Sequence, residues 1–336
     1  MQANPLVDSF GRVHTYLRVS VTDRCNLRCS YCAPPHDIQW KTRSDILTFE
    51  EILRISKLLV SRGVVKIRLT GGEPTVRKNI EWLIEQLAIL PGLSTVAMTT
   101  NGLLLKEKAY ALKASGLTSL NVSLDTLRED RFRMITSRDR FREVLAGIEA
   151  SLANGFRPLK LNTVIMAGVN DDELIDFIEF VKDKPINVRF IEFMPSRGTW
   201  WQQDRIVSFL EMKRRIEFIY PLKPIEHDDC PNEMDPRSVA RDYSVEGFIG
   251  SVSFITPMTR QFCNCCSRLR LTADGSIKTC LFSPAEVDLR AAIRQGAEDQ
   301  ALADLIQNAL EFKKERPGLS ECSTLWANHA MYAIGG

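Results

Sequence analysis

Three cysteines near the start of the chain have a spacing suited to metal chemistry. Cys25, Cys29 and Cys32 follow the pattern Cys-x-x-x-Cys-x-x-Cys, and Tyr31 directly precedes the last of them. Three thiolates can bind three irons of a four-iron cluster and leave the fourth iron open to another ligand, whereas electron-transfer clusters normally have four cysteines. The spacing therefore favours a cluster that takes part in a reaction. Zinc held by these cysteines and His36 is the alternative.

A second cysteine group lies towards the C-terminus. Cys263, Cys266 and Cys280 are spaced Cys-x-x-Cys-x13-Cys and again supply three ligands rather than four. This pattern predicts a second cluster with an open iron that could bind substrate. The alternative is a zinc knuckle with Cys265 as fourth ligand, which is disfavoured because two adjacent cysteines could hardly both reach one ion without strain.

A pair of arginines follows this second group in the run Ser267-Arg268-Leu269-Arg270-Leu271. Residues two apart on a strand point to the same face, so Arg268 and Arg270 would project together. Two guanidinium groups suit a polyphosphate, because each can hold phosphate oxygens with two hydrogen bonds. A solvated basic strand face is the alternative interpretation.

The bulk composition is that of an ordinary globular protein. The chain has 336 residues, is 44% hydrophobic and 26% charged, and has a net charge of +2, which gives no reason to expect nucleic-acid binding. It has no apolar run long enough for a membrane span and no signal peptide, so a cytoplasmic location without membrane association is expected. Nine cysteines in such a chain argue against a disulfide framework. Cys230 and Cys322 are interpreted as structural or incidental thiols.

Strands and helices are predicted to alternate six times, which implies a parallel sheet with helical crossovers. Glycines 63, 92, 116 and 155 lie where helix C-caps belong. The periodicity leaves an open partial barrel and a doubly wound sheet as alternatives. The predicted strands are 16–21, 65–69, 95–99, 119–123, 159–165 and 187–192, and the predicted helices are 49–61, 80–89, 106–114, 142–153 and 172–181.

Most polar and special residues fall at the carboxyl ends of these strands, where parallel α/β folds place their active sites. The run Thr70-Gly71-Gly72-Glu73-Pro74 follows the second strand, for example, and Met194-Pro195 follows the sixth. After residue 200 the alternation fails. Segment 200–246 contains four prolines and is interpreted as a connector with irregular structure. Beyond it the sequence predicts strands at 247–256, 267–272 and 277–281, a hairpin turn at 273–276, and helices at 288–294 and 299–314.

The first cysteine motif, together with Gly71-Gly72-Glu73-Pro74 after the second strand, resembles the radical S-adenosylmethionine superfamily. The resemblance implies that the amino and carboxylate groups of S-adenosylmethionine chelate the open iron. An electron from the cluster then cleaves the sulfonium and releases a 5′-deoxyadenosyl radical. Glycines suit this role because they let the backbone approach a bound amino acid closely.

With the second cysteine group, the arginine pair and the terminal Gly335-Gly336, nearly the whole chain resembles the GTP 3′,8-cyclase family of molybdenum cofactor biosynthesis. The resemblance implies an α/β fold: an open, six-stranded parallel β/α barrel with a smaller C-terminal region that carries a second cluster. The expected division is an N-terminal extension at 1–14, a barrel domain at 15–220, and an auxiliary-cluster and GTP-binding region with a flexible Gly-Gly tail at 221–336.

The resemblance also implies a reaction. The radical removes the ribose 3′ hydrogen of GTP, and C3′ attacks guanine C8 to give (8S)-3′,8-cyclo-7,8-dihydroguanosine 5′-triphosphate, the first step of the pathway. The implied partners are GTP, an external electron donor and a downstream cyclic pyranopterin monophosphate synthase, while a homodimer is left open.

The resemblance assigns residues to three kinds of contact, and no catalytic side chain beyond the cluster and cofactor site. The expected ligands of two 4Fe–4S clusters are Cys25, Cys29, Cys32, Cys263, Cys266 and Cys280. The expected contacts of S-adenosylmethionine are Tyr31, Gly72, Ser123 and Met194. The expected GTP contacts are Arg18, Arg68, Thr99, Lys160, Arg268, Leu269 and Arg270.

Two other functions fit part of the sequence. One is a radical enzyme with an auxiliary cluster that acts on a peptide, although such enzymes usually have more C-terminal cysteines. The other is a non-catalytic iron–sulfur electron-transfer protein, which the two open irons and the arginine pair disfavour. Cys265 departs from the family pattern as an extra thiol in the second cysteine loop.

Overall fold

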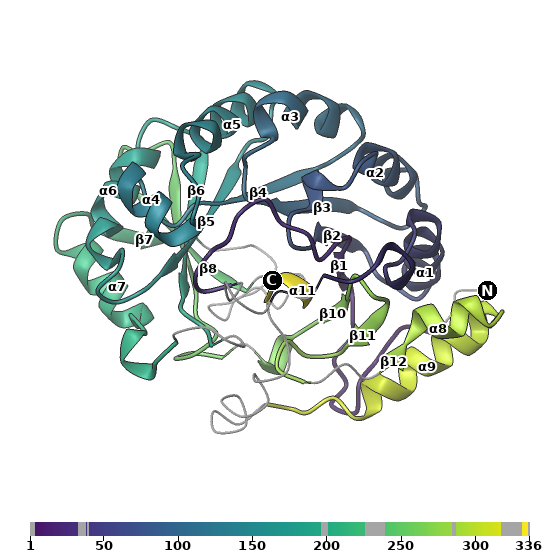
Figure 1. Cartoon of the computed structure of the whole chain (residues 1–336). Coiled ribbons are helices and arrows are strands. Elements are labelled where there is room, and N and C mark those ends of the chain that lie inside the picture. The colour runs from purple at the N-terminus through teal and green to yellow at the C-terminus, as the bar shows by residue number, and fades with distance from the viewer. Residues whose placement is uncertain are drawn as a thin grey trace.

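The fold is a single curved sheet surrounded by helices (Figure 1). The computed structural model describes residues 4–32, 38, 40–195, 201–225, 239–261, 263–283, 287–316 and 331–334. The twelve strands of the described chain run in the order β12-β11-β10-β1-β2-β3-β4-β5-β6-β9-β8-β7. This order is linear, so the sheet curves without closing into a barrel.

The strands are β1 (Tyr16–Ser20), β2 (Lys66–Thr70), β3 (Thr95–Thr100), β4 (Ser119–Ser123), β5 (Leu159–Ile165), β6 (Ile186–Glu192), β7 (Leu222–Pro224), β8 (Ala240–Val245), β9 (Ser251–Ile255), β10 (Arg268–Leu271), β11 (Ser276–Lys278) and β12 (Val287–Asp288). The helices are α1 (Phe49–Ser61), α2 (Ile80–Ala88), α3 (Leu105–Ala114), α4 (Glu129–Thr136), α5 (Phe141–Ala153), α6 (Leu174–Val181), α7 (Phe209–Glu217), α8 (Leu289–Arg294), α9 (Asp299–Glu311) and α11 (Met331–Ile334).

The predicted open parallel barrel is confirmed. Strands β1 to β6 pair in parallel in chain order, and Figure 1 shows α1 to α6 around the outside of the curve. The remaining strands extend this sheet at both ends. Strand β9 pairs in parallel with β6, β10 pairs in parallel with β1, and the outermost strands are antiparallel.

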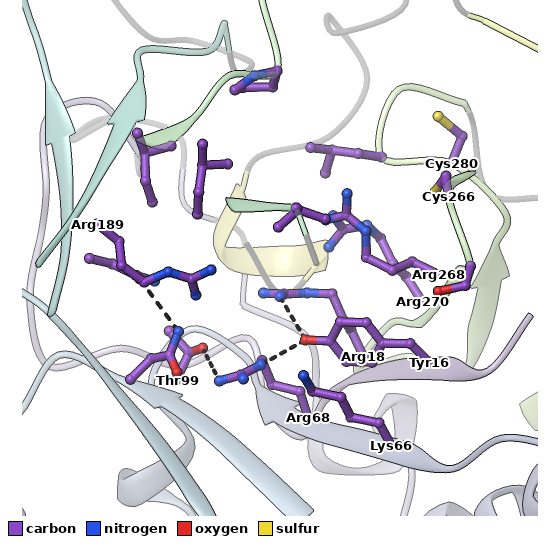
Figure 2. Close-up of a pocket in the computed structure, with 18 of the residues that line it drawn as sticks. Tyr16, Arg18, Lys66, Arg68, Thr99, Arg189, Cys266, Arg268, Arg270 and Cys280 are labelled. Carbon is purple, nitrogen blue, oxygen red and sulfur yellow. Dashed lines mark hydrogen bonds between the residues drawn. The ribbon is translucent and has the colours of Figure 1, made fainter. Parts of the chain in front are cut away.

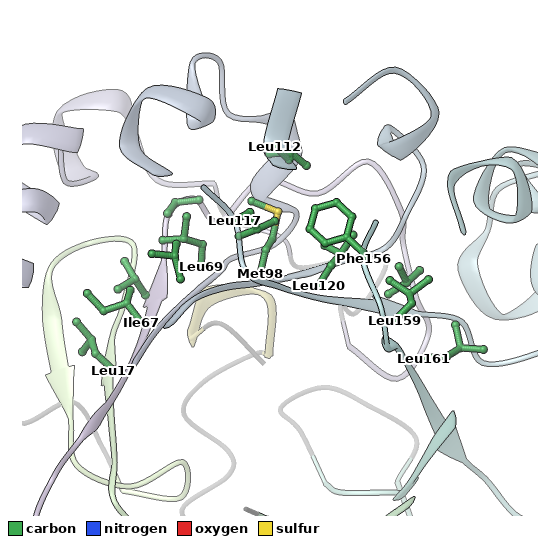
Figure 3. Packing of buried hydrophobic residues seen from close by; sticks show 14 of the residues in the cluster. Leu17, Ile67, Leu69, Met98, Leu112, Leu117, Leu120, Phe156, Leu159 and Leu161 are labelled. Carbon is green, nitrogen blue, oxygen red and sulfur yellow. The ribbon is translucent and has the colours of Figure 1, made fainter. Parts of the chain in front are cut away.

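The strands alternate between apolar and polar side chains, and this alternation separates the core from the inside of the curve. Leu17, Ile67 and Leu269 are fully buried and belong to the main hydrophobic cluster, which packs between sheet and helices (Figure 3). Their neighbours along each strand are basic or polar. Because side chains on a strand point alternately to opposite faces, these neighbours line the inner face.

Local signals set several helix boundaries as predicted. Thr48 caps α1 through a reciprocal capping box with Glu51, so the helix starts at the predicted residue. Gly63 and Gly116 have φ values of +98° and +95° after their helices, a left-handed conformation that favours glycine.

The interpretation of 200–246 as a connector is wrong in part. It contains α7, β7 and β8, although residues 226–238 lie outside the described ranges. In α7 the buried residues are Phe209, Met212 and Ile216, a narrow apolar stripe on a helix whose other residues are charged except for the exposed Leu210. That stripe was masked by its polar surroundings. The short α4 was not predicted either, for the same reason. None of the described helices is both long and apolar enough to cross a bilayer.

Candidate functional site

The first cysteine loop follows β1 and docks on the glycine-rich loop that follows β2. The backbone N–H of Gly72 donates to the carbonyl of Thr22 at 2.7 Å, and that of Glu73 donates to the carbonyl of Arg24 at 2.7 Å. These bonds join the two sequence motifs that were predicted to act together. They form because β1 and β2 are parallel neighbours, so their carboxyl ends meet at one edge of the sheet.

Glycine is required at position 72 by close approach. A Cβ atom there would lie 2.3 Å from the carbonyl oxygen of Arg24 and 2.6 Å from that of Asp23. Both contacts are with backbone, which cannot swing aside as a long side chain could. The loop carrying Cys25 would have to shift.

We therefore expect Gly72→Ala to reduce both the iron bound at the first cysteine loop and the affinity for S-adenosylmethionine. Overpacking of this kind costs about 1–3 kcal/mol of stability. Gly296→Ala is the control, because a Cβ atom at position 296 would meet no atom within 4 Å. The φ of Gly296 is +88°, so this substitution also strains the backbone and costs about 1–2 kcal/mol of stability. Iron analysis measures the cluster content and equilibrium dialysis the affinity for S-adenosylmethionine, and we expect both to fall in Gly72→Ala but not in Gly296→Ala. Normal cofactor binding in Gly72→Ala would remove this contact from the site.

Glu73 is fully buried and connects the glycine-rich loop to the end of β3. Its carboxylate accepts hydrogen bonds from the backbone N–H of Asn101 at 2.7 Å and from the hydroxyl of Thr100 at 2.7 Å. The side-chain amide of Asn101 in turn donates to Asn26 Oδ1 at 2.7 Å and reaches Cys25 Sγ at 3.8 Å. Loops after three strands are thereby held together around the first cysteines.

The three sulfurs of the first group lie close enough to affect one another. Burial, followed by the charges of Cys32 and Asp125 and then of Cys25, raises the pKa of Cys29 well above its usual value. Burial also raises the pKa of Cys32 to about 12. In the described part of the chain, no three His, Cys, Asp or Glu side chains are arranged to hold a single metal ion. The fit to a cluster rests on the cysteine spacing and on this shared, partly buried loop, where donors face Cys25 Sγ.

Tyr31 is fixed against the neighbouring strand ends. Its hydroxyl donates to Asp125 Oδ2 at 2.7 Å, and Asp125 Oδ1 accepts from the backbone N–H of Val164 at 2.9 Å. The ring packs edge-on against Phe193 with centroids 6.4 Å apart. Burial raises the pKa of Asp125 to about 6. Sequence reasoning did not single out Asp125 as the partner of Tyr31.

The second cysteine group lies between the short helical turn at Cys263–Cys265 and the β10–β11 hairpin. Burial and then the charges of Cys280 and Cys266 raise the pKa of Cys263 to about 11, so the three predicted ligands are neighbours. The pKa of Cys266 shifts the other way. Burial raises it, but the charges of Arg268 and Lys313 outweigh this and lower it to about 7.

Arg12 of the N-terminal segment and Lys313, which lies two residues after α9, contact this second cysteine loop. Arg12 donates to the carbonyl of Cys263 at 2.7 Å and to the carbonyls of Lys314 and Glu315 at 3.0 Å. The buried ammonium of Lys313 reaches the Sγ of Cys266 at 3.7 Å. The predicted extension at 1–14 thus contributes contacts to the second cysteine loop, which its sequence did not reveal.

A cavity of about 560 Å³ lies inside the curved sheet and extends to the second cysteine group (Figure 2). Asp242 is the one acidic residue that lines it within the described chain. The predicted site residues that line it are Arg18, Arg68, Thr99, Lys160, Met194, Cys263, Cys266, Arg268, Arg270 and Cys280. The cavity therefore combines three cysteines with a basic wall, the name used here for the side chains of Arg18, Arg68, Arg268 and Arg270 and their neighbours on β1, β2 and β10.

Strand register brings the basic side chains together. Arg18 on β1 is level with Arg270 on β10 and with Arg68 on β2, and all three lie on the inner face. The prediction that Arg268 and Arg270 share a face is confirmed, because both line the cavity. Leu269 differs: its side chain is fully buried in the core. Any contact of Leu269 with a molecule in the cavity would come from its backbone.

Three further residues of the wall were missed. Tyr16, Lys66 and Arg189 also line the cavity. A signal for the first two was present, because Tyr16 precedes Arg18 by two residues and Lys66 precedes Arg68 by two. The same period-two argument that was applied to β10 would have found both.

Some predicted residues lie apart from this cavity or outside the described ranges. Tyr31, Gly72 and Ser123 do not line it, although each is at the carboxyl end of the strands with the first cysteine loop. Met331 of α11 lines the cavity, but the Gly335-Gly336 tail lies outside the described residues. So do His36, Cys230 and Cys322.

Comparison with protein families gives two matches that together span most of the chain. Residues 19–181 match the radical SAM superfamily, and residues 186–318 match the family described as Molybdenum Cofactor Synthesis C. The first match contains the first cysteine loop and the glycine-rich loop. The second contains the second cysteine group and the arginine pair.

Curated relatives resemble the chain over nearly all of its length. It is 47% identical to the mitochondrial GTP 3′,8-cyclase of Arabidopsis thaliana, covering 98% of this chain and 83% of the relative. It is 42% identical to the GTP 3′,8-cyclase of Moorella thermoacetica, covering 98% and 99%. The Molybdenum cofactor biosynthesis protein 1 of Drosophila melanogaster is 46% identical, and the chain spans 54% of its length.

Among solved structures, the crystal structure of SuiB from Streptococcus suis superimposes with a TM-score of 0.61 at 14% identity. The match covers 90% of this chain and 67% of SuiB. At this level of identity the likeness shows the fold alone.

Proposed function

The chain belongs to the radical S-adenosylmethionine superfamily and, within it, to the GTP 3′,8-cyclases of molybdenum cofactor biosynthesis, and on that premise we propose that it converts GTP to (8S)-3′,8-cyclo-7,8-dihydroguanosine 5′-triphosphate. The observation that carries this proposal is the cavity whose basic wall lies beside the second cysteine group. A triphosphate requires several cations, and this wall provides them.

Membership of the superfamily implies S-adenosylmethionine and a 4Fe–4S cluster as cofactors. Cys25, Cys29 and Cys32 would hold this cluster, which, when bound, supplies the electron that cleaves S-adenosylmethionine to the 5′-deoxyadenosyl radical. Gly72 and Tyr31 belong to the loops around these cysteines, and Met194 lines the cavity. Their contacts with S-adenosylmethionine are part of the proposal.

Cys263, Cys266 and Cys280 would hold the second cluster and present its open iron to the guanine end of GTP. The triphosphate would then lie along the inner faces of β10, β1 and β2, where Arg270, Arg18 and Arg68 are level with one another. Thr99 supports this wall, because its hydroxyl accepts a hydrogen bond from Arg68 Nη1 at 3.2 Å. Lys160 on β5 also lines the cavity.

We expect Arg268→Ala to weaken GTP binding about 10- to 100-fold, since a charge-assisted hydrogen bond contributes about 1.5–3 kcal/mol. Cleavage of S-adenosylmethionine in the absence of GTP should persist, because Arg268 is outside the first cysteine loop. Equilibrium dialysis with GTP, alongside the 5′-deoxyadenosine yield, measures both. Arg62→Ala serves as the control for loss of an arginine, because Arg62 directly follows α1 and does not line the cavity. Equal GTP affinity in Arg268→Ala would remove it from the site.

The wider assignments follow from the same premise. The enzyme would receive its electron from an external donor and pass its product to a cyclic pyranopterin monophosphate synthase. The homodimer and the cytoplasmic location stay predictions from the sequence, as does the division at 1–14, 15–220 and 221–336.

A further inference from the structure

The inner faces of three adjacent strands form a small grid of side chains in which one residue is not a cation. In the first row, Tyr16 on β1 is level with Arg268 on β10 and Lys66 on β2. In the second row, Arg18 is level with Arg270 and Arg68. Tyr16 thus occupies the centre of one row, with basic residues on both sides and in the row beside it.

The hydroxyl of Tyr16 contacts this grid directly. Arg68 Nε donates to the Tyr16 oxygen at 2.7 Å, and Arg18 Nη1 lies 3.5 Å from the same atom (Figure 2). The ammonium of Lys66 lies 4.9 Å from the centre of the Tyr16 ring. Two guanidinium groups therefore converge on one phenol oxygen, which accepts from both.

The charges that face Tyr16 come from every element packed against it. Arg18 lies on its own strand, Lys66 and Arg68 on β2, and Arg268 and Arg270 on β10. The cavity is also lined by Lys160 on β5, Arg189 on β6 and Asp242 on β8. Burial raises the pKa of Tyr16, but the charges of Arg68, Arg18 and Lys66 outweigh it and lower the pKa to about 6.

We propose that the Tyr16 oxygen is the resident anionic partner of the basic wall and takes up a proton when a triphosphate binds in its place. This role of Tyr16 rests on the proposed function and adds to it the uptake of one proton when GTP binds. The phenolate holds Arg18 and Arg68 in position while the cavity lacks substrate. The incoming anion then takes over those guanidinium groups, and a proton from solvent binds the Tyr16 oxygen.

GTP binding is expected to weaken as pH rises. Above the pKa of free Tyr16 the phenolate must be protonated for tight binding, so affinity falls as pH rises, by up to about tenfold per pH unit. The decline ends where pH exceeds the pKa of Tyr16 in the complex, which the bound anion moves back towards its ordinary value of about 10. Below about pH 6, Tyr16 is protonated in both states and contributes no dependence.

The test is calorimetric titration of the reconstituted holoenzyme with GTP at about pH 7.5 in two buffers of different ionisation enthalpy. The difference in heat gives the protons taken up, which should approach about one per GTP in the wild type. Tyr16→Phe keeps the ring and loses the oxygen, so its uptake should be smaller by nearly that amount. The terminal phosphate of GTP titrates equally in both proteins and cancels in the comparison. Tyr110→Phe, at an exposed position on α3, is the control.

Tripolyphosphate in place of GTP separates this inference from the proposed function. If the wild type takes up the proton with tripolyphosphate but does not bind GTP, the role of Tyr16 stands and the GTP assignment fails. If the wild type binds GTP and Tyr16→Phe takes up as many protons, the role of Tyr16 is overturned. Circular dichroism and iron content confirm that the variant is folded and contains its iron. If the wild type itself takes up no proton when it binds the ligand, the proposal is overturned without any variant.

Discussion

Replacing Cys29 with alanine is expected to abolish cleavage of S-adenosylmethionine. Two remaining cysteines cannot hold three irons, so the first cluster would not assemble with the open iron that the cofactor requires. The measurement is the yield of 5′-deoxyadenosine after anaerobic reconstitution and reduction with dithionite. We expect no detectable product from Cys29→Ala, with or without GTP.

Ser30→Ala is the matched control, because it alters the same loop and leaves all three thiols in place. The backbone N–H of Ser30 donates to the carbonyl of Ile135 at 2.9 Å, a bond that the substitution retains. The control should yield 5′-deoxyadenosine as the wild type does. Undiminished cleavage in Cys29→Ala, with iron and sulfide measured in both proteins, would contradict the assignment of the first cluster.

Replacing Cys280 with alanine is expected to have a different effect: loss of the nucleotide product while cleavage of S-adenosylmethionine persists. Cys280 lines the cavity with the other two cysteines of its group, whereas the first cysteine loop does not line it. Removing it should therefore prevent assembly of the proposed second cluster, and with it the proposed site for the guanine base. Chromatography of the nucleotide product and of 5′-deoxyadenosine from the same reaction measures both effects.

Cys265→Ala distinguishes the two ligand sets that the sequence allowed. If Cys263, Cys266 and Cys280 are the ligands, Cys265→Ala retains its full iron content and Cys280→Ala loses about half. If Cys265 is instead the fourth ligand of a zinc ion, neither variant loses iron and both lose zinc. Retention of product by Cys280→Ala would place the substrate elsewhere.

Much of the fold could be predicted because each strand–helix unit carries its own signal. The capping box at Thr48 and the left-handed glycines such as Gly63 set boundaries locally, so α1, β4 and β5 start and end at the predicted residues. Helix α7 also carries a local signal, because the Ser208 side chain accepts a hydrogen bond from the backbone N–H of Glu211 at its start. It was missed because its apolar stripe is only three residues wide and prolines follow it closely in segment 200–246.

The parts of the site that show as residue spacing in the sequence could be predicted, whereas the parts that depend on how strands pair could not. The cysteine motifs and the arginine pair on β10 are visible in the sequence. The alignment of Arg270, Arg18 and Arg68 depends on β10 joining β1, two strands separated by some 250 residues that no local pattern connects. Arg12 at Cys263 and Asp125 at Tyr31 are likewise contacts that only the fold creates.

The central claim, radical cyclisation of GTP, is tested most directly by following one hydrogen atom. GTP carrying deuterium at the ribose 3′ position is incubated anaerobically with the reconstituted enzyme, S-adenosylmethionine and dithionite, with ATP and no nucleotide as comparisons. The account predicts deuterium in 5′-deoxyadenosine and a new nucleotide, both only with GTP. Cleavage of S-adenosylmethionine that ignores GTP and leaves 5′-deoxyadenosine without deuterium would contradict it.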